Sequence, residues 1–237
     1  MVLSPKEGAK IVASKAKHVK IEEKALRNWE IVLKLQSSGS SSFFRRALGF
    51  GLVICSRYSI LFLHNENEEG WKVEGHSGYF ALCAAINRAI KEKVDITNPT
   101  FYSTITEKQL QNILRSDTKI ECPLISDRVK CLHEVGNALL ENFEGSFKNV
   151  VKQCNNNAEK LLQLIVNNFN CFRDEADYQG EKIAIYKRAQ ILIGDIWACF
   201  KNKGIGYFED IDKITAFADY RVPQTLLCLE LLSTLKN

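Results

Sequence analysis

Two charged residues stand in stretches of the sequence that are otherwise mostly apolar. Lys187 lies in I-A-I-Y-K-R-A-Q-I-L-I-G-D-I-W-A-C (183–199), and Asp219 lies in T-A-F-A-D-Y-R-V-P-Q (215–224). A charge buried without a partner is costly, so each group needs an opposite charge, a changed proton affinity or a reachable cleft. Two interpretations stay open: a structural ion pair that ties two elements together, and a catalytic acid/base or electrostatic pair.

The helical period predicts the element that positions the lysine. On a helix that starts near Ala184, Lys187 shares one face with Ala184 itself and with Ile191, Gly194 and Ala198, which are apolar or small. The ammonium group is therefore expected to point toward packed neighbours.

The aspartate is predicted at a junction between two helices. A helix over 214–220 should end at Asp219 and the residue after it, because Val222 precedes Pro223 and pre-proline residues avoid the helical region. Pro223 suits the first turn of a following helix that continues through 224–235. A carboxylate at such a junction can be aimed out of the helix ends into a cavity.

Composition predicts a globular protein and excludes several classes of function. The chain has 237 residues, of which 46% are hydrophobic and 25% charged, enough for one large domain or two small ones. The net charge is +4, and the lysines and arginines are interspersed with acidic residues, so the composition does not require a nucleic-acid partner. The nearest approach to a basic stripe is interpreted as a solvated helix face: Lys10, Lys15, Lys17, Lys20 and Lys24.

Cysteine, histidine and glycine spacings argue against a metal or a nucleotide cofactor. The eight cysteines never form C-x-x-C and mostly sit in apolar helical patterns, which predicts reduced core thiols. The four histidines lack ligand spacing, and G-x-G at 49–51 and 204–206 does not continue to a dinucleotide or P-loop motif. Without a signal peptide or a membrane-spanning run, the chain is expected to be soluble and cytoplasmic, with no cofactor and no metal.

Helical periodicity dominates the rest of the chain and predicts a mainly α fold. A strand signal is seen only over 51–74. The first predicted helix is 78–93, with Leu82, Ala85, Ile86 and Ala89 inward, and the second opens with a Thr104–Glu107 capping box and runs through Leu110, Ile113 and Leu114. The third is capped by Ser126 or Asp127 and has Val129, Leu132, Val135, Leu139 and Leu140 inward. A long helical run follows from Phe147 through Val166.

A serine-rich stretch, S-S-G-S-S-S at 37–42, predicts a flexible linker. It suggests three parts: an amino-terminal helical segment over 1–36, a linker and atypical segment over 37–76, and a helical core over 77–237.

Five ordered blocks of the sequence resemble one known family. The blocks are S-G-Y-F-A-L-C-A-A-I-N-R-A (77–89), I-L-R-S-D-T (113–118), F-E-G-S-F-K-N (143–149), Y-K-R-A-Q-I-L (186–192) and F-A-D-Y-R-V-P-Q (217–224). They are similar to the queuosine salvage proteins, the queuosine 5'-phosphate N-glycosylases/hydrolases. The resemblance implies a single all-helical domain akin to DNA glycosylases, and an N-glycosidase that releases queuine from queuosine 5'-phosphate, a small-molecule substrate, for salvage into tRNA modification.

The resemblance also implies roles for residues at the two charged stretches. Asp219 is expected to be the catalytic carboxylate with Lys187 beside it, and Phe217 to line the base pocket, although its position alone suits plain core packing equally well. Tyr220 and Arg221 are expected to bind substrate too, although by position Arg221, like Arg188, also suits a surface or ion-pair residue. Breaking a ribosyl C–N bond builds positive charge on the sugar, which a fixed carboxylate can stabilise or capture.

The chain departs from the family pattern in two places. Residues 43–63 lack the block usual there, and the sequence stops at Asn237, before an acidic element that the family uses to bind the base. One alternative is therefore a non-catalytic isoform or incomplete gene product of the same family. Another is a DNA-binding glycosylase-like module, suggested by Gly204-Ile205-Gly206, although no stable nucleic-acid complex and no membrane contact are expected.

Overall fold

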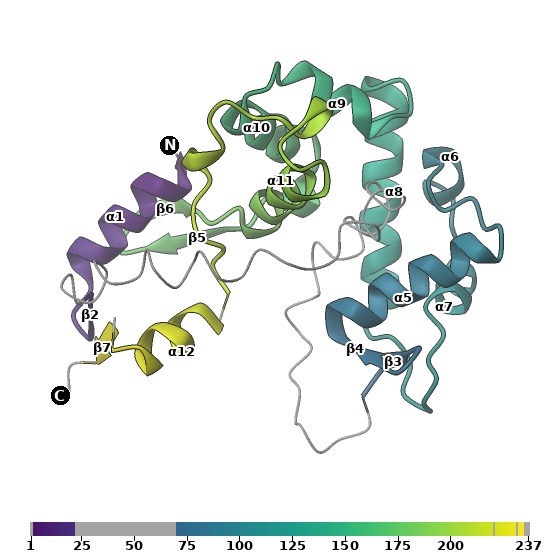
Figure 1. Ribbon diagram of the computed structural model, residues 1–237, viewed down its shortest axis with the longest axis horizontal. Helices are drawn as coiled ribbons and strands as arrows, with labels where there is room; N and C mark the ends of the chain where they lie inside the picture. The colour runs from purple at the N-terminus through teal and green to yellow at the C-terminus, as the bar shows by residue number, and fades with distance from the viewer. Residues whose placement is uncertain (1, 22–69, 220, 231, 235–237) are drawn as a thin grey trace.

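The computed structural model describes residues 2–21, 70–219, 221–230 and 232–234, and this part of the chain is mostly helical, as the sequence predicts (Figure 1). None of the helices in these ranges is long and apolar enough to cross a membrane. The helices are α1 (Pro5–Lys15), α5 (Gly78–Lys91), α6 (Pro99–Tyr102), α7 (Glu107–Ile113), α8 (Ile125–Asn142), α9 (Phe147–Gln153), α10 (Ala158–Asn168), α11 (Lys187–Cys199) and α12 (Arg221–Cys228). Short 3-10 turns are η3 (Asn170–Phe172), η4 (Gly204–Gly206) and η5 (Ile211–Lys213).

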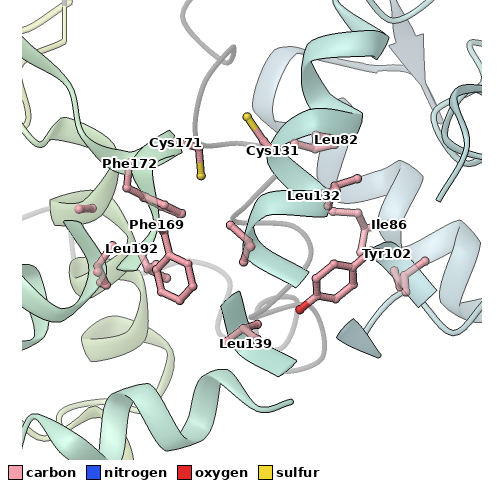
Figure 2. Close-up of a cluster of buried hydrophobic side chains, with 14 of the residues drawn as sticks. Leu82, Ile86, Tyr102, Cys131, Leu132, Leu139, Phe169, Cys171, Phe172 and Leu192 are labelled. Atoms are coloured by element: carbon pink, nitrogen blue, oxygen red, sulfur yellow. The ribbon is translucent and has the colours of Figure 1, made fainter. Parts of the chain in front are cut away.

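The central element is α8, which stands between α5, α6 and α7 on one side and α9, α10 and α11 on the other (Figure 1). Figure 2 shows Leu132 of α8 beside Ile86 and Tyr102, with Phe169 and Phe172 across the core. Leu132 and Phe169 are fully buried, and burying a side chain of this size contributes roughly 1.5–3 kcal/mol. One continuous core thus connects the two helical groups.

The predicted helix over 78–93 is confirmed as α5 (Gly78–Lys91). All four residues assigned to its inward stripe are buried: Leu82, Ala85, Ile86 and Ala89.

The start of α7 differs from the prediction by two residues. The capping box is formed by Thr106 and Gln109, because Thr106 has the extended backbone that an N-cap requires. Thr104 instead donates its hydroxyl to the carbonyls of Thr100 and Phe101 at the end of α6. The Thr104–Glu107 box is therefore wrong, whereas the predicted inward residues Leu110, Ile113 and Leu114 are buried.

The predicted caps of α8 are also wrong. The helix starts at Ile125 after Leu124, whose φ of 60° places it in the left-handed region, so Ser126 and Asp127 lie inside the first turn. Four of the five predicted inward residues are buried, namely Val129, Leu132, Val135 and Leu139. Leu140 is 41% exposed and faces out.

The long helical run predicted from Phe147 is broken into α9 and α10. Asn155 and Asn156 adopt φ of 52° and 62°, a left-handed pair that no helix can contain. Asn157 then caps α10 by accepting the Lys160 amide at 2.6 Å. Asparagine tolerates the left-handed region and is also a good N-cap, so these three residues end one helix and begin the next. The apolar pattern continues on both sides and does not reveal the break.

The strands lie largely outside the segment where the sequence predicts them. A three-stranded sheet has the order β1 (Val2–Leu3), β6 (Glu181–Ala184) and β5 (Glu175–Tyr178), with β1 parallel and β5 antiparallel to β6. Gln179 and Gly180 connect β5 and β6 with φ of 49° and 83°, as a tight hairpin turn requires. Within 51–74, residues 51–69 lie outside the described ranges, and β3 (Lys72–Val73) pairs with β4 (His76–Ser77).

The amino-terminal segment packs on this sheet. Besides the β1–β6 pairing, α1 lies so close to β6 that a Cβ on Gly8 would stand 2.2 Å from Cγ2 of Ile183. The predicted linker over 37–42 lies outside the described residues. The division into 1–36, 37–76 and 77–237 stays a prediction. In the structure, β1 and α1 contact β6, which belongs to the third of these parts.

The expectation of core thiols holds for most of the cysteines that the structure describes. Cys83 is half-buried, Cys228 is exposed, and Cys55 lies outside the described ranges. The buried ones are Cys122, Cys131, Cys154, Cys171 and Cys199.

We expect Gly136→Ala to destabilise the protein. A Cβ at position 136 would lie 2.7–2.9 Å from Cβ, Cα and N of Ser103, and backbone atoms cannot move aside easily. We expect a loss of about 1–3 kcal/mol in the free energy of unfolding, more than offsetting the roughly 1 kcal/mol by which alanine favours a helix. Urea denaturation measures it. Asn137→Ala, at the neighbouring exposed position, is the control and should be neutral or stabilising; equal behaviour of both variants would contradict the close α6–α8 packing.

Candidate active site

The start of α11 is fixed by Asp174. Its carbonyl accepts the amides of Ile185 at 3.0 Å and Tyr186 at 3.2 Å, and its carboxylate Oδ2 accepts the Lys187 amide at 3.1 Å. Tyr186 adopts a φ of 48°, which turns the chain from β6 into the helix. The predicted helix start near Ala184 is wrong, because β6 continues through Ala184 and Lys187 is the first helical residue.

The two charges that open the question lie in contact. Nζ of Lys187 is 2.6 Å from Oδ2 of Asp219. The side chain of Lys187 is 6% exposed, whereas that of Asp219 is 34% exposed. The lysine is therefore a buried ammonium whose partner carboxylate can be reached from solvent.

The segment that carries the aspartate is irregular over 214–219, and the predicted helix there is wrong. The Thr215 amide donates to the Gln190 side chain at 2.8 Å, and the Asp219 amide donates to the Phe217 carbonyl at 2.7 Å. These bonds replace the helical pattern. The expected position of Pro223 is confirmed, in the first turn of α12 (Arg221–Cys228).

The helix predicted through 224–235 is shorter than expected. After α12 ends at Cys228, the chain forms β7 (Leu232–Thr234), which pairs antiparallel with β2 (Val19–Ile21). The alternation needed for a strand is too brief here to be distinguished from a leucine-rich helix.

Phe217 lies over α11 at Gly194 and stands two residues before Asp219 in the chain. The residue is 37% exposed, and a Cβ on Gly194 would stand 3.0 Å from Cζ of the ring. The absence of a side chain at Gly194 therefore lets the ring approach the helix. An aromatic face is left partly open two residues from the Asp219 carboxylate.

The remaining predicted site residues are placed only in part. Tyr220 and the side chain of Arg221 lie outside the described residues. Arg188 donates to the Cys171 carbonyl at 2.6 Å and lies 3.9 Å from the Asp174 carboxylate. Its interpretation as an ion-pair residue is confirmed.

This arrangement suits stabilisation of a positive charge. A carboxylate whose position is fixed by a buried ammonium can face a cationic centre without reorganising. An adjacent aromatic ring offers a stacking surface for a flat heterocycle. Within the described ranges, no group of three or more histidine, cysteine, aspartate or glutamate residues is arranged to hold a metal ion.

Comparison with known proteins identifies the family of this chain. Residues 58–237, most of the chain and including both charged residues, match the family described as queuosine salvage protein. The chain belongs to the queuosine salvage protein family.

Individual relatives agree with the family match. A Nematostella vectensis protein is 40% identical over 248 aligned residues that cover 98% of this chain and 72% of the relative. A Mus musculus protein is 39% identical over 96% of this chain and 72% of its own length, and a Schizosaccharomyces pombe protein is 40% identical over 69% and 48%. All three are named queuosine 5'-phosphate N-glycosylase/hydrolase.

Gly206, in the G-x-G at 204–206, has a packing role in this member of the queuosine salvage family. A Cβ on Gly206 would stand 2.5 Å from Cβ of Phe200 and 2.8 Å from the Ile196 carbonyl oxygen. The Gly206 amide donates to the Lys203 carbonyl. The turn η4 therefore needs glycine at position 206 for its contact with α11.

Sequence reasoning did not single out three polar residues of this region, namely Asp174, Gln190 and Asp195. Asp174 lies in a polar stretch where it does not stand out, so its anchoring of α11 has no sequence signal. Gln190 and Asp195 do interrupt the apolar pattern of 183–199, as Lys187 does. The same test that selected the lysine would have selected them.

Asp195 is a carboxyl group in unfavourable surroundings. Its Oδ2 is fully buried and, among the described residues, accepts no hydrogen bond. Burial raises the pKa of the Asp195 carboxyl to about 6. The folded protein thus binds this proton more tightly than the unfolded chain does, and the stability gained from protonation is lost as the pH rises through about 6.

We expect Asp195→Asn to stabilise the protein at pH 8 and to leave its stability almost unchanged at pH 4. The amide stays neutral where the buried carboxylate must ionise, so the melting temperature should rise by a few degrees at pH 8, at about 2–4 °C per kcal/mol. Thermal unfolding across this pH range measures the gap. Asp177→Asn, at an exposed position, should show none. A melting temperature that falls at pH 8 would mean that the carboxylate has a stabilising partner.

Proposed function

We propose that this chain hydrolyses the N-glycosidic bond of queuosine 5'-phosphate and releases queuine. The observation that carries the proposal is the solvent-reachable Asp219 carboxylate, held at 2.6 Å by the buried Lys187 ammonium. The family gives this pair its context, because the relatives are named for that reaction on that substrate.

In the proposed mechanism, Asp219 is the catalytic carboxylate. As the bond between C1' and the base nitrogen breaks, its electron pair goes to the base and positive charge develops on the ribose. The carboxylate stabilises that charge or captures C1'. Water then supplies its oxygen to C1' and a proton to the released base, which balances the hydrolysis.

The neighbouring residues have supporting roles in this proposal. Lys187 keeps the carboxylate ionised and oriented, since an opposite charge at hydrogen-bond distance favours the charged form. Phe217 offers its exposed ring to the flat base. Tyr220 and Arg221 are proposed to contact the substrate, on the basis of their place in the same sequence block.

The wider setting belongs to the same proposal. The helical core over 77–237 is proposed to share its architecture with DNA glycosylases. In support, the glycine turn η4 precedes the segment that carries the Asp219 carboxylate. A cytoplasmic location is supported by the buried thiols, because reducing compartments keep cysteines in this state.

We expect Asp219→Asn to lower the rate of queuine release by roughly a hundredfold or more, because the amide cannot oppose a developing cation. The fold should survive, since the amide oxygen can still accept from Lys187. Queuine release and thermal unfolding should be measured on the same samples of the full chain.

The control for this substitution is Asp177→Asn, which changes an exposed aspartate on β5 in the same way. It should leave both readouts unchanged. Near-normal specific activity of Asp219→Asn would end the catalytic assignment. Absence of queuine release from the unmodified chain would favour the non-catalytic alternative.

A binding measurement separates this function from that of a DNA-binding module. Lysines and arginines are scattered over the chain, so few can contact phosphates together, and duplex DNA should bind weakly and with a strong dependence on salt. Fluorescence anisotropy with a labelled duplex at 50 and 200 mM salt gives the result. Tight, sequence-selective binding at the higher salt would contradict the nucleotide-hydrolase assignment.

A further inference from the structure

Gln190 joins the two ends of the candidate site through three hydrogen bonds. Its side chain is buried at 2% exposure. Nε2 donates to the Ile185 carbonyl at 3.1 Å, in the turn that leads into α11. Oε1 accepts both the amide and the hydroxyl of Thr215, at 2.8 and 2.9 Å. One amide group therefore connects the beginning of α11 to the irregular segment over 214–219.

This connection matters because the segment over 214–219 is irregular. It lacks the repeating bonds of a helix or strand, and a cavity of about 250 Å³ lined by Gln190, Ile214 and Thr215 lies beside it. Side-chain packing does not fill that space. The segment also contacts α11 through the Asp219–Lys187 pair and the Phe217 ring.

The geometry also places the link close to the chemistry. Gln190 is one helical turn beyond Lys187 on α11, and Thr215 is four residues before Asp219. A shift of Thr215 away from Gln190 would therefore move the carboxylate relative to the ammonium. Misplacing a reacting group by about 1 Å can cost roughly a hundredfold in rate.

We propose that Gln190 and Thr215 form a positioning clamp, which holds the Asp219 carboxylate in its reactive place while neither clamp residue touches the substrate. The inference rests on the proposed function for its effect on rate. The clamp itself rests on the three hydrogen bonds alone.

The side-chain chemistry makes the clamp testable in parts. Glutamine is able to donate at one end and accept twice at the other, whereas Gln190→Met keeps the length of the side chain and removes all three bonds. Thr215→Val keeps the shape and the amide bond to Gln190 but removes the hydroxyl, which lies 2.9 Å from Oε1 of Gln190 and 3.4 Å from the Ala216 carbonyl oxygen. Thr215→Ser restores the hydroxyl and serves as the rescue variant.

The matched control is Thr118→Val. Thr118 is also half-buried, and its hydroxyl also joins separate segments, donating to the Gly70 carbonyl at 3.0 Å. It follows α7 in the chain and contacts Gly70, which precedes β3. The helices α5 and α7 lie on the other side of α8 from α11 (Figure 1). Removing its hydroxyl should affect stability alone.

Two measurements on the full chain test the clamp. The first is hydrogen–deuterium exchange of the amides over 214–219, read by mass spectrometry. The second is kcat and KM for queuine release from queuosine 5'-phosphate, corrected for the folded fraction. Gln190→Met should speed exchange in the segment and lower kcat by roughly tenfold or more with KM changed less than about twofold, because a misplaced carboxylate loses transition-state contact selectively.

The two Thr215 variants should have smaller effects than Gln190→Met. Thr215→Val should show a lesser loss of kcat, and Thr215→Ser should recover most of it. Thr118→Val should leave both exchange over 214–219 and kcat as in the unmodified chain. Unchanged exchange in Gln190→Met would overturn the clamp, and faster exchange with unchanged kcat would overturn its positioning role. If the unmodified chain releases no queuine, the proposed function fails, while the exchange measurement still decides whether the clamp exists.

Discussion

The contact between the buried Lys187 ammonium and the Asp219 carboxylate sets the main constraint on this half of the molecule. An ammonium with 6% of its side chain exposed has lost most of its hydration, so its carboxylate partner must stay in place. The fold meets this requirement from both sides. Asp174 and the β5–β6 hairpin fix the start of the helix that carries the lysine, while Gln190 and Thr215 hold the segment that carries the aspartate.

A pair of this kind contributes less to stability than its short distance suggests. The attraction in a buried ion pair is largely offset by the cost of removing both charges from water, so an apolar pair would stabilise the fold as well or better. Stability alone therefore does not account for this pair, whereas the exposed side of the carboxylate is available for chemistry. The partly open Phe217 ring beside it fits the same explanation.

The sequence predicted the features that depend on long periodic patterns or on isolated charges. The helix over 78–93, the buried stripe of α8 and the contact between Lys187 and Asp219 all follow from such signals. The prediction failed where short-range backbone chemistry decides the outcome, as at the left-handed Asn155–Asn156 pair, and where a distant side chain does, as in the irregular segment over 214–219. That segment is shaped by a side chain 25 residues away in sequence, which no local pattern can reveal.

The central claim is that Lys187 and Asp219 act as one catalytic unit, and a double-variant cycle tests it most directly. Single-turnover queuine release would be measured for Lys187→Met, Asp219→Asn and the combined variant. Groups that act as a unit are strongly non-additive, so the combined variant should be no more than about threefold slower than the slower single variant. Rate losses that multiply in the combined variant would show that the two residues act independently and would contradict the account.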